Sequence, residues 1–119
     1  DAEHINQIGA KLADLATRTE DFGGIFDYDA KSERLRTVNA SLEDPTVWND
    51  PKKAQELGKE KKALDGVVVT LNTLTSELSD NSELFEMSKE EGDDAGLLTI
   101  EVEGKKLSAI VEQLEFRRM

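Results

Sequence analysis

The sequence has 119 residues, no cysteine, and 15 lysines and arginines against 26 aspartates and glutamates, for a formal net charge of −11. The lack of cysteine excludes disulfides and thiolate metal sites and favours the reducing cytoplasm, while the negative charge argues against a general nucleic-acid binder, because such proteins gain affinity by neutralising phosphates. With 34% charged and only 5% aromatic residues, the composition favours helices with charged outer faces over a β-sandwich.

The first helix is predicted over about residues 4–19. Its apolar positions recur at steps of three and four residues, at Ile5, Ile8, Leu12 and Leu15. This spacing places them on one helical face. Phe22-Gly23-Gly24 is expected to end the helix, because two successive glycines weaken a helix and permit a tight reversal.

The second helix is predicted to begin at Asp27 or Asp29, either of which can act as the N-cap residue. It is expected to end at Asp44, because the proline that follows disfavours helical geometry in the residue before it. Residues 45–50 then form a turn with a hydrophobic anchor. Trp48 in this turn is interpreted as packing on the core, with a contact to a partner as the alternative, because aromatic residues are enriched at interfaces.

The longest helix is predicted over residues 51–79. Asp50 and Pro51 suit the N-cap and the first helical position. Leucines recur every seven residues, at Leu57, Leu64, Leu71 and Leu78. This repeat is typical of a coiled-coil seam. A break is expected at Ser79–Ser82.

A short apolar helix is expected after this break. It would carry Leu84, Phe85 and Met87. These side chains are interpreted as a lid over the end of the bundle, or as a docking patch if they are exposed together.

The last segment begins with an acidic loop or helix start at residues 90–96. A second seven-residue series follows, at Ile100, Leu107 and Leu114, with Gly104 interrupting the helix and Val102 off the seam. Two heptad segments with a short connection should be antiparallel neighbours. The predicted fold is therefore all-α, a single domain over residues 1–119 that forms a helical bundle with a long antiparallel coiled-coil-like hairpin. Self-association through exposed leucines is an open possibility.

The residues offer no catalytic grouping. His4 is the single histidine and is expected to be a solvated surface residue, because a triad or a metal site needs partners. The acidic run near Glu90 lacks the ligand order of an EF-hand, and Glu101 and Glu103 should point in different directions on a helix. We expect no cofactor, no metal and no enzymatic activity. The residues alone indicate an acidic helical interaction domain whose two ends resemble cuts in a longer protein.

Several segments resemble a known family. Residues 25–35 read Ile-Phe-Asp-Tyr-Asp-Ala-Lys-Ser-Glu-Arg-Leu, residues 38–51 read Val-Asn-Ala-Ser-Leu-Glu-Asp-Pro-Thr-Val-Trp-Asn-Asp-Pro, and residues 54–60 read Ala-Gln-Glu-Leu-Gly-Lys-Glu. Together with Leu-Glu-Phe-Arg-Arg-Met at 114–119, they resemble the N-terminal helical domain of the bacterial class I peptide chain release factors. Val47-Trp48-Asn49-Asp50 with Asp27-Tyr28-Asp29 favours the release factor 2 branch.

The resemblance implies that the whole protein would recognise UAA or UGA in the ribosomal A site and trigger peptidyl-tRNA hydrolysis. The family's Ser-Pro-Phe and Gly-Gly-Gln motifs do not occur in these 119 residues, so no decoding or catalytic residue is carried over. The domain that remains would contact the stalk base of the large ribosomal subunit and the class II release factor GTPase, with no direct nucleic-acid site and no membrane contact. The alternative is a stand-alone coiled-coil adaptor or chaperone-like protein.

Overall fold

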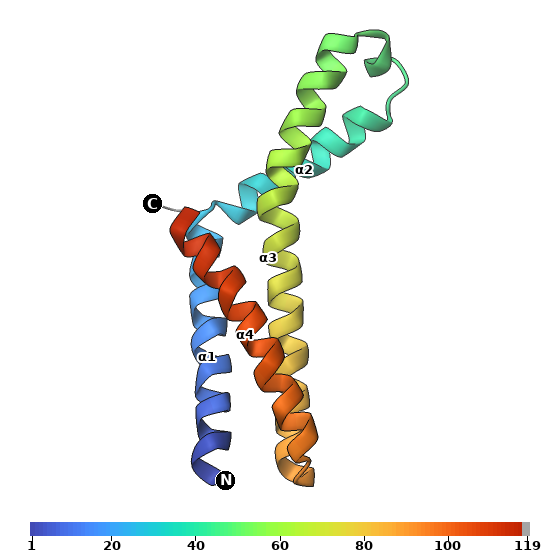
Figure 1. Ribbon diagram of the computed structural model, residues 1–119. Coiled ribbons are helices and arrows are strands. Elements are labelled where there is room, and N and C mark those ends of the chain that lie inside the picture. Colours follow the sequence, from blue (N-terminus) through green and yellow to red (C-terminus); the bar gives the residue numbers. More distant parts are fainter. Residues whose placement is uncertain (118–119) are drawn as a thin grey trace. The chain divides into compact units, whose positions relative to one another are not determined.

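The computed structural model describes residues 1–117, and every regular element in this range is a helix (Figure 1). The α-helices are α1 (Ala2–Ile25), α2 (Tyr28–Glu43), α3 (Pro51–Glu91) and α4 (Asp94–Arg117), and a 3-10 helix, η1, covers Val47–Asn49. The prediction of an all-α fold is therefore confirmed. The chain divides into two compact units: unit 1 joins Asp1–Asp21 with Thr73–Met119, and unit 2 is Phe22–Asn72. The single-domain organisation over residues 1–119 stays a prediction.

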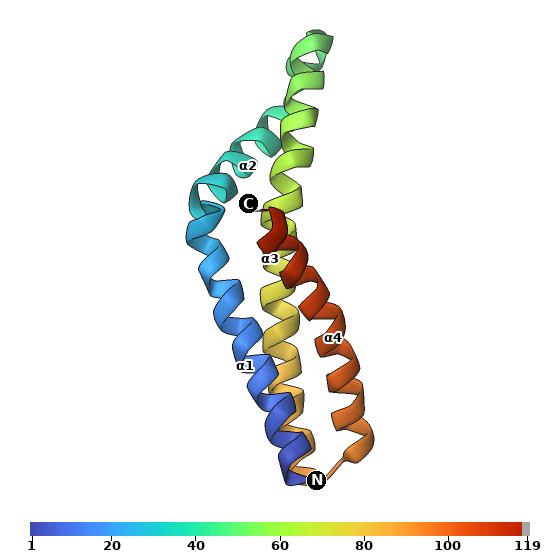
Figure 2. The ribbon, with the colours of Figure 1, turned by 60° about the vertical axis from the view of Figure 1, so that its left-hand side comes forward.

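Unit 1 is a bundle of three helical segments, in which α1 and α4 run beside the C-terminal half of α3 (Figure 2). Its interior is built from the predicted stripes of α1 and α4, which are continuous along each helix. The buried members are Ile8, Leu12, Leu15, Leu97, Ile100, Leu107, Val111 and Leu114. Val102 is half exposed, so its predicted place off the seam is confirmed. Gly104 lies in the buried stripe of α4 and does not interrupt the helix.

The break predicted at Ser79–Ser82 is wrong, because α3 continues without interruption to Glu91. The seven-residue series extends from Leu78 to Phe85, and both are buried. Asn81 and Ser88 occupy the companion positions and are also buried. The buried stripe of α3 therefore continues beyond Leu78 through positions that polar residues occupy, which the spacing of apolar residues alone does not reveal.

A two-residue turn joins α3 to α4, and it explains why the chain reverses direction within the acidic stretch. Gly92 has a φ of +66°, a left-handed conformation that glycine adopts without steric cost. The Gly92 amide donates to the Lys89 carbonyl, and the Asp93 amide donates to the Ser88 carbonyl, which together form a Schellman motif. Asp93 then caps α4, since its Oδ1 accepts a 2.9 Å hydrogen bond from the Gly96 amide. The antiparallel arrangement predicted for the two segments is confirmed for this half of α3.

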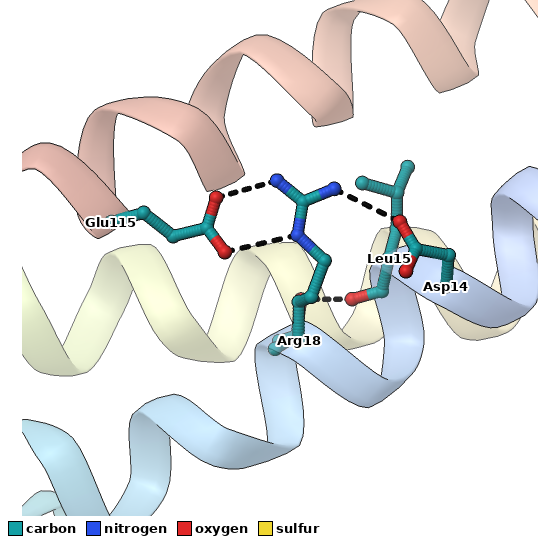
Figure 3. A network of polar contacts seen from close by, with 5 residues as sticks. Asp14, Leu15, Arg18 and Glu115 are labelled. Atoms are coloured by element: carbon teal, nitrogen blue, oxygen red, sulfur yellow. Dashed lines mark hydrogen bonds and ion pairs between the residues drawn. The ribbon is translucent and has the colours of Figure 1, made fainter.

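An ion-pair cluster joins α1 to the last turn of α4 (Figure 3). The Arg18 guanidinium donates to both carboxylate oxygens of Glu115, with Nε at 3.0 Å and Nη2 at 2.5 Å. Its Nη1 donates to Asp14 Oδ2 at 2.9 Å. The hydrogen bond to Glu115, and then that to Asp14, raises the pKa of Arg18 above its ordinary value. This cluster ties the C-terminal end of α4 to α1 within unit 1.

Unit 2 is a hairpin of α2 and the N-terminal half of α3. A small apolar cluster lies between the two helices, with Leu35, Val38, Leu64 and Val68 buried and Tyr28, Leu42 and Leu57 packed against it. At one end the Tyr28 hydroxyl donates to Asn72 Oδ1, and further along Arg34 forms two hydrogen bonds with Glu60. The two units therefore share the seam predicted along α3. Leu57 and Leu64 pack against α2 in unit 2, whereas the residues of α3 from Thr73 onward belong to unit 1.

The end predicted for the first helix at Phe22-Gly23-Gly24 is also wrong. Helix α1 runs through both glycines to Ile25, and the reversal falls at Asp27, which has a φ of +53°. Phe22 is 1% exposed, so burial of its ring holds the helical turn despite a cost of about 1 kcal/mol per glycine. Asp27 is the N-cap of α2 by position, as predicted, but its side chain makes no capping hydrogen bond.

Candidate partner-binding surfaces

The turn between α2 and α3 exposes the single tryptophan. The hydrophobic anchor of this turn is Val47, which is buried, whereas the Trp48 side chain is 60% exposed. The packing interpretation of Trp48 is therefore wrong. The indole Nε1 donates a 2.8 Å hydrogen bond to the Leu42 carbonyl, which satisfies an orphan acceptor at the end of α2. This bond holds the indole at its nitrogen while more than half of the side chain remains exposed.

The three apolar residues predicted after the break on α3 do not lie together. The Phe85 ring is buried against α1, at 3.0 Å from the position that a Cβ on Gly9 would take. Leu84 and Met87 are each at least half exposed and, three residues apart, share one helical face. They form neither a lid nor a three-residue patch, and Phe85 has no surface to offer a partner.

A further exposed apolar stripe lies on α4. Leu98, Val102 and Phe116 are 56%, 52% and 74% exposed. Their spacing of four and fourteen residues places them on one face, away from the buried stripe. This face was not predicted, although the spacing of these residues could have indicated it.

The leucines of the predicted seam are buried within the chain itself, Leu64, Leu71, Leu78, Leu107 and Leu114 among them. They are therefore not available to join two copies of the chain. Leu84 and Leu98 are the exposed leucines, so self-association through these two stays a prediction.

Charge is divided unequally between the units. Unit 2 carries eight lysines and arginines against nine acidic residues, for a net charge of −1, whereas the remaining 68 residues carry seven against seventeen, for −10. Almost the whole negative charge of the chain thus belongs to unit 1. A polyanionic partner would be repelled much less by unit 2.

The titratable groups considered for catalysis are engaged in structural pairs. His4, expected to be solvated without a partner, has its Nε2 2.8 Å from Glu101 Oε2, so that part of the prediction is wrong. Glu103 pairs with Lys106 instead, and the two glutamates thus point to different neighbours, as predicted. Across residues 1–117, no cluster of three or more acidic or histidine side chains is arranged to hold a metal ion. Nor does a helix in this range have the length and apolar content needed to cross a bilayer.

Comparison with known proteins identifies close relatives. The PCRF domain family matches residues 31–119. Over all 119 residues, the chain is 70% identical to peptide chain release factor 2 of Acidovorax sp. strain JS42 and of Variovorax paradoxus strain S110, and 52% identical to that of Burkholderia pseudomallei strain K96243. In each case the match covers the whole chain but 32% of the relative.

The chain thus spans about a third of the length of these relatives. Since the PCRF match extends over most of the helical fold and the relatives are named as peptide chain release factors, the resemblance noted in the sequence is confirmed. The chain belongs to the PCRF domain family and is homologous to part of bacterial peptide chain release factor 2, a translation termination factor.

Proposed function

We propose that this chain is the non-catalytic, N-terminal helical domain of a factor that ends translation at UAA and UGA codons. The observation that carries the proposal is the 70% identity to peptide chain release factor 2 over every residue of the chain. The rest of the factor would supply codon recognition and peptidyl-tRNA hydrolysis. A helical domain of this kind contributes by holding contact surfaces in fixed positions rather than by chemistry.

The domain is proposed to contact the stalk base of the large ribosomal subunit and the class II release factor GTPase. Two exposed groups suit such contacts. Trp48 presents an open indole whose position is fixed by its hydrogen bond to Leu42, and Leu84 with Met87 presents an apolar pair. The indole of Trp48 is held by its hydrogen bond and therefore loses little entropy on binding, which favours it as an anchor, while Leu84 and Met87 supply apolar area.

Peptide release by the 119-residue chain tests the assignment to a non-catalytic domain. Stop-programmed ribosomes carrying labelled peptidyl-tRNA should release no more peptide with this chain than with buffer. The longer factor supplied by the parent gene should release it within the same assay. Stop-dependent release by the 119-residue chain itself would contradict the proposal.

The contact residues are tested by substitution in the longer factor. Trp48→Gln and the pair Leu84→Gln with Met87→Gln should each weaken binding to ribosomes or to the GTPase by about tenfold, because loss of an interface anchor costs about 1–2 kcal/mol. Leu98→Gln is the matched control, since it removes an equally exposed leucine outside the proposed contacts. Equal losses in all three variants, or none, would reject these surfaces.

A further inference from the structure

The end of α4 carries the most exposed of the large apolar side chains in residues 1–117. Phe116 is 74% exposed and lies in the last turn of this helix. Ala109 and Gln113, seven and three residues earlier, are also exposed and share its side of the helix. The three residues line a shallow hollow together with Glu112 and Arg117. We call Ala109, Gln113 and Phe116 the α4 end face.

Packing within unit 1 does not involve this face. The buried stripe of α4 passes through Leu107, Val111 and Leu114, which lie on the opposite side of the helix. A single exposed apolar residue is common on protein surfaces. Here the Phe116 ring borders a hollow that could receive an apolar side chain, and burial of both would be favourable. The α4 end face therefore has the features of a contact surface that the 119 residues leave open.

The Arg18 cluster holds the backbone that carries this face (Figure 3). Glu115, the residue before Phe116, accepts two hydrogen bonds from the Arg18 guanidinium, and Asp14 accepts a third. A bidentate pair of this kind is geometrically specific. The side chains of Arg18 and Glu115 are 27% and 34% exposed, so water screens the pair only in part. The last turn of a helix usually frays, but this one is tied to α1.

The chemistry of the α4 end face suits an apolar protein surface. Glu112 and Arg117 have opposite charges, so the hollow itself adds no net charge, although unit 1 carries seven basic and seventeen acidic residues, for −10. A nucleic acid would find no excess of cations here. The relatives named above supply an occupant, because the match covers only 32% of their length and leaves about two thirds of the factor outside these 119 residues.

We infer that the α4 end face packs against the part of the longer factor that follows residue 119, and that Arg18 is a positioning residue for this contact. The inference rests on the proposed function, because that function makes the chain the N-terminal part of a longer factor. A segment that leaves the helix beside its docking face closes only a short loop to reach it, which costs little entropy. Docking here would bury the Phe116 ring and fix the direction in which the rest of the factor leaves unit 1.

Thiol modification in the 119-residue chain and in the longer factor tests the inference. The 119 residues contain no cysteine, so Ala109→Cys places one thiol within the α4 end face, and mass spectrometry of its peptide follows the reaction with iodoacetamide. This thiol should react about tenfold more slowly in the longer factor, as expected when the covered state is about ten times more populated than the open one. Leu98→Cys is the matched control, because Leu98 is exposed on the same side of α4 but about 27 Å from Phe116, at 1.5 Å per residue. Its thiol should react at the same rate in both proteins.

Further substitutions in the Ala109→Cys background separate the anchor from the positioning residue. In the longer factor, Phe116→Gln should restore the fast reaction, because the ring that docks is removed. Arg18→Gln should raise the rate severalfold, and Arg18→Lys should raise it nearly as much, because lysine keeps the charge but cannot form the bidentate pair. Neither Arg18 variant should change the rate in the 119-residue chain, where a purely structural loosening of unit 1 would also appear. Circular dichroism verifies that each variant remains helical.

Equal rates for the Ala109→Cys thiol in the two proteins would overturn the inference. Slowing that affects the Leu98→Cys thiol equally, or that survives Phe116→Gln, would also overturn it, because another surface would then cover α4. Slowing that increases with protein concentration would overturn it in favour of a second copy of the chain. If the thiol is protected in a longer factor that releases no peptide, the proposed function fails and the inference stands; if peptide is released and the thiol is unprotected, the reverse holds.

Discussion

Unit 1 and unit 2 are made of the same kind of helices but differ in how completely they bury their apolar stripes. In unit 1 three helical segments enclose side chains such as Leu15 and Val111, which have no exposed area. In unit 2 two helices share a small cluster in which Val38 is fully buried, whereas Leu35 and Leu64 each keep 8% of their surface exposed. Because these two leucines are less completely enclosed than Leu107 of unit 1, each contributes less stability.

The net charges of the two units also differ. Unit 1 holds nearly all the net negative charge, whereas unit 2 is close to neutral and carries the exposed Trp48. Packing and surface chemistry are thus distributed differently in one small chain.

Truncating one buried leucine in each unit gives the largest expected effect. Leu107→Ala in unit 1 should lower the free energy of unfolding by about 3–4 kcal/mol, and Leu64→Ala in unit 2 by about 2 kcal/mol, because cavity cost rises with enclosure. Urea unfolding followed by circular dichroism measures both. A larger loss for Leu64→Ala would contradict the difference in packing. A single transition that shifts in both variants would support one domain over residues 1–119, and two transitions would reject it.

The next largest effect on stability is expected at the turn between α3 and α4 in unit 1. Gly92→Ala should destabilise the chain by about 1–2 kcal/mol, because the φ of +66° at this position is costly for a residue with a Cβ. The Schellman hydrogen bonds of Gly92 and Asp93 would also weaken. The same urea experiment measures the change, with Gly58→Ala as the control in ordinary helical geometry. A neutral Gly92→Ala would show that the turn relaxes to another conformation.

The sequence predicted the helical class, the proline-bounded end of α2 and most of the buried stripes, because these follow from residue spacing alone. It did not predict where α1 and α3 continue. At Gly23 and Gly24 the local cost of glycine was outweighed by burial of Phe22, and at Asn81 and Ser88 polar side chains occupied core positions. In both cases tertiary packing overrode local propensity.

The candidate contact residues were only partly predictable. Trp48, Leu84 and Phe85 were identified by residue type, but exposure depends on which helix covers which face. Phe85 is covered because Gly9 of α1 leaves room for its ring, a contact between residues 76 positions apart that no local pattern encodes.

Substitution of Gly66 in unit 2 should change the stability of the chain in the opposite direction to substitution of Gly92. Gly66→Ala is expected to stabilise the chain by about 0.5–1 kcal/mol, because alanine favours the helix and the added Cβ meets open space. Thermal unfolding should show a Tm higher by a few degrees. If Gly66→Ala were destabilising, the space beside Gly66 on α3 would be filled in solution, which would contradict the open space seen there in the structure.

The smallest effect is a dependence of unit 2 on pH. Hydrogen bonds from Arg34 hold the pKa of Glu60 below its ordinary value of 4.5, and hydrogen bonds from the Thr46 amide and hydroxyl lower the pKa of Asp44 below 3.8. Because the folded state favours both ionised forms, their contribution is present above these ordinary values and is lost as the pH falls through the lowered ones. Both groups are exposed to solvent, so the loss of stability should be slight.

An NMR titration of the side-chain carboxyl carbons measures these pKa values directly. Glu60 should titrate below 4.5 in the parent chain and return toward that value in Arg34→Gln, because the lowering originates mainly in the hydrogen bonds from Arg34. Asp44 should be unaffected by Arg34→Gln, since its partner is Thr46. If Glu60 titrated at or above 4.5 in the parent chain, the Arg34 pair would not be formed in solution, and the two helices of unit 2 would be held together by their small apolar cluster without it.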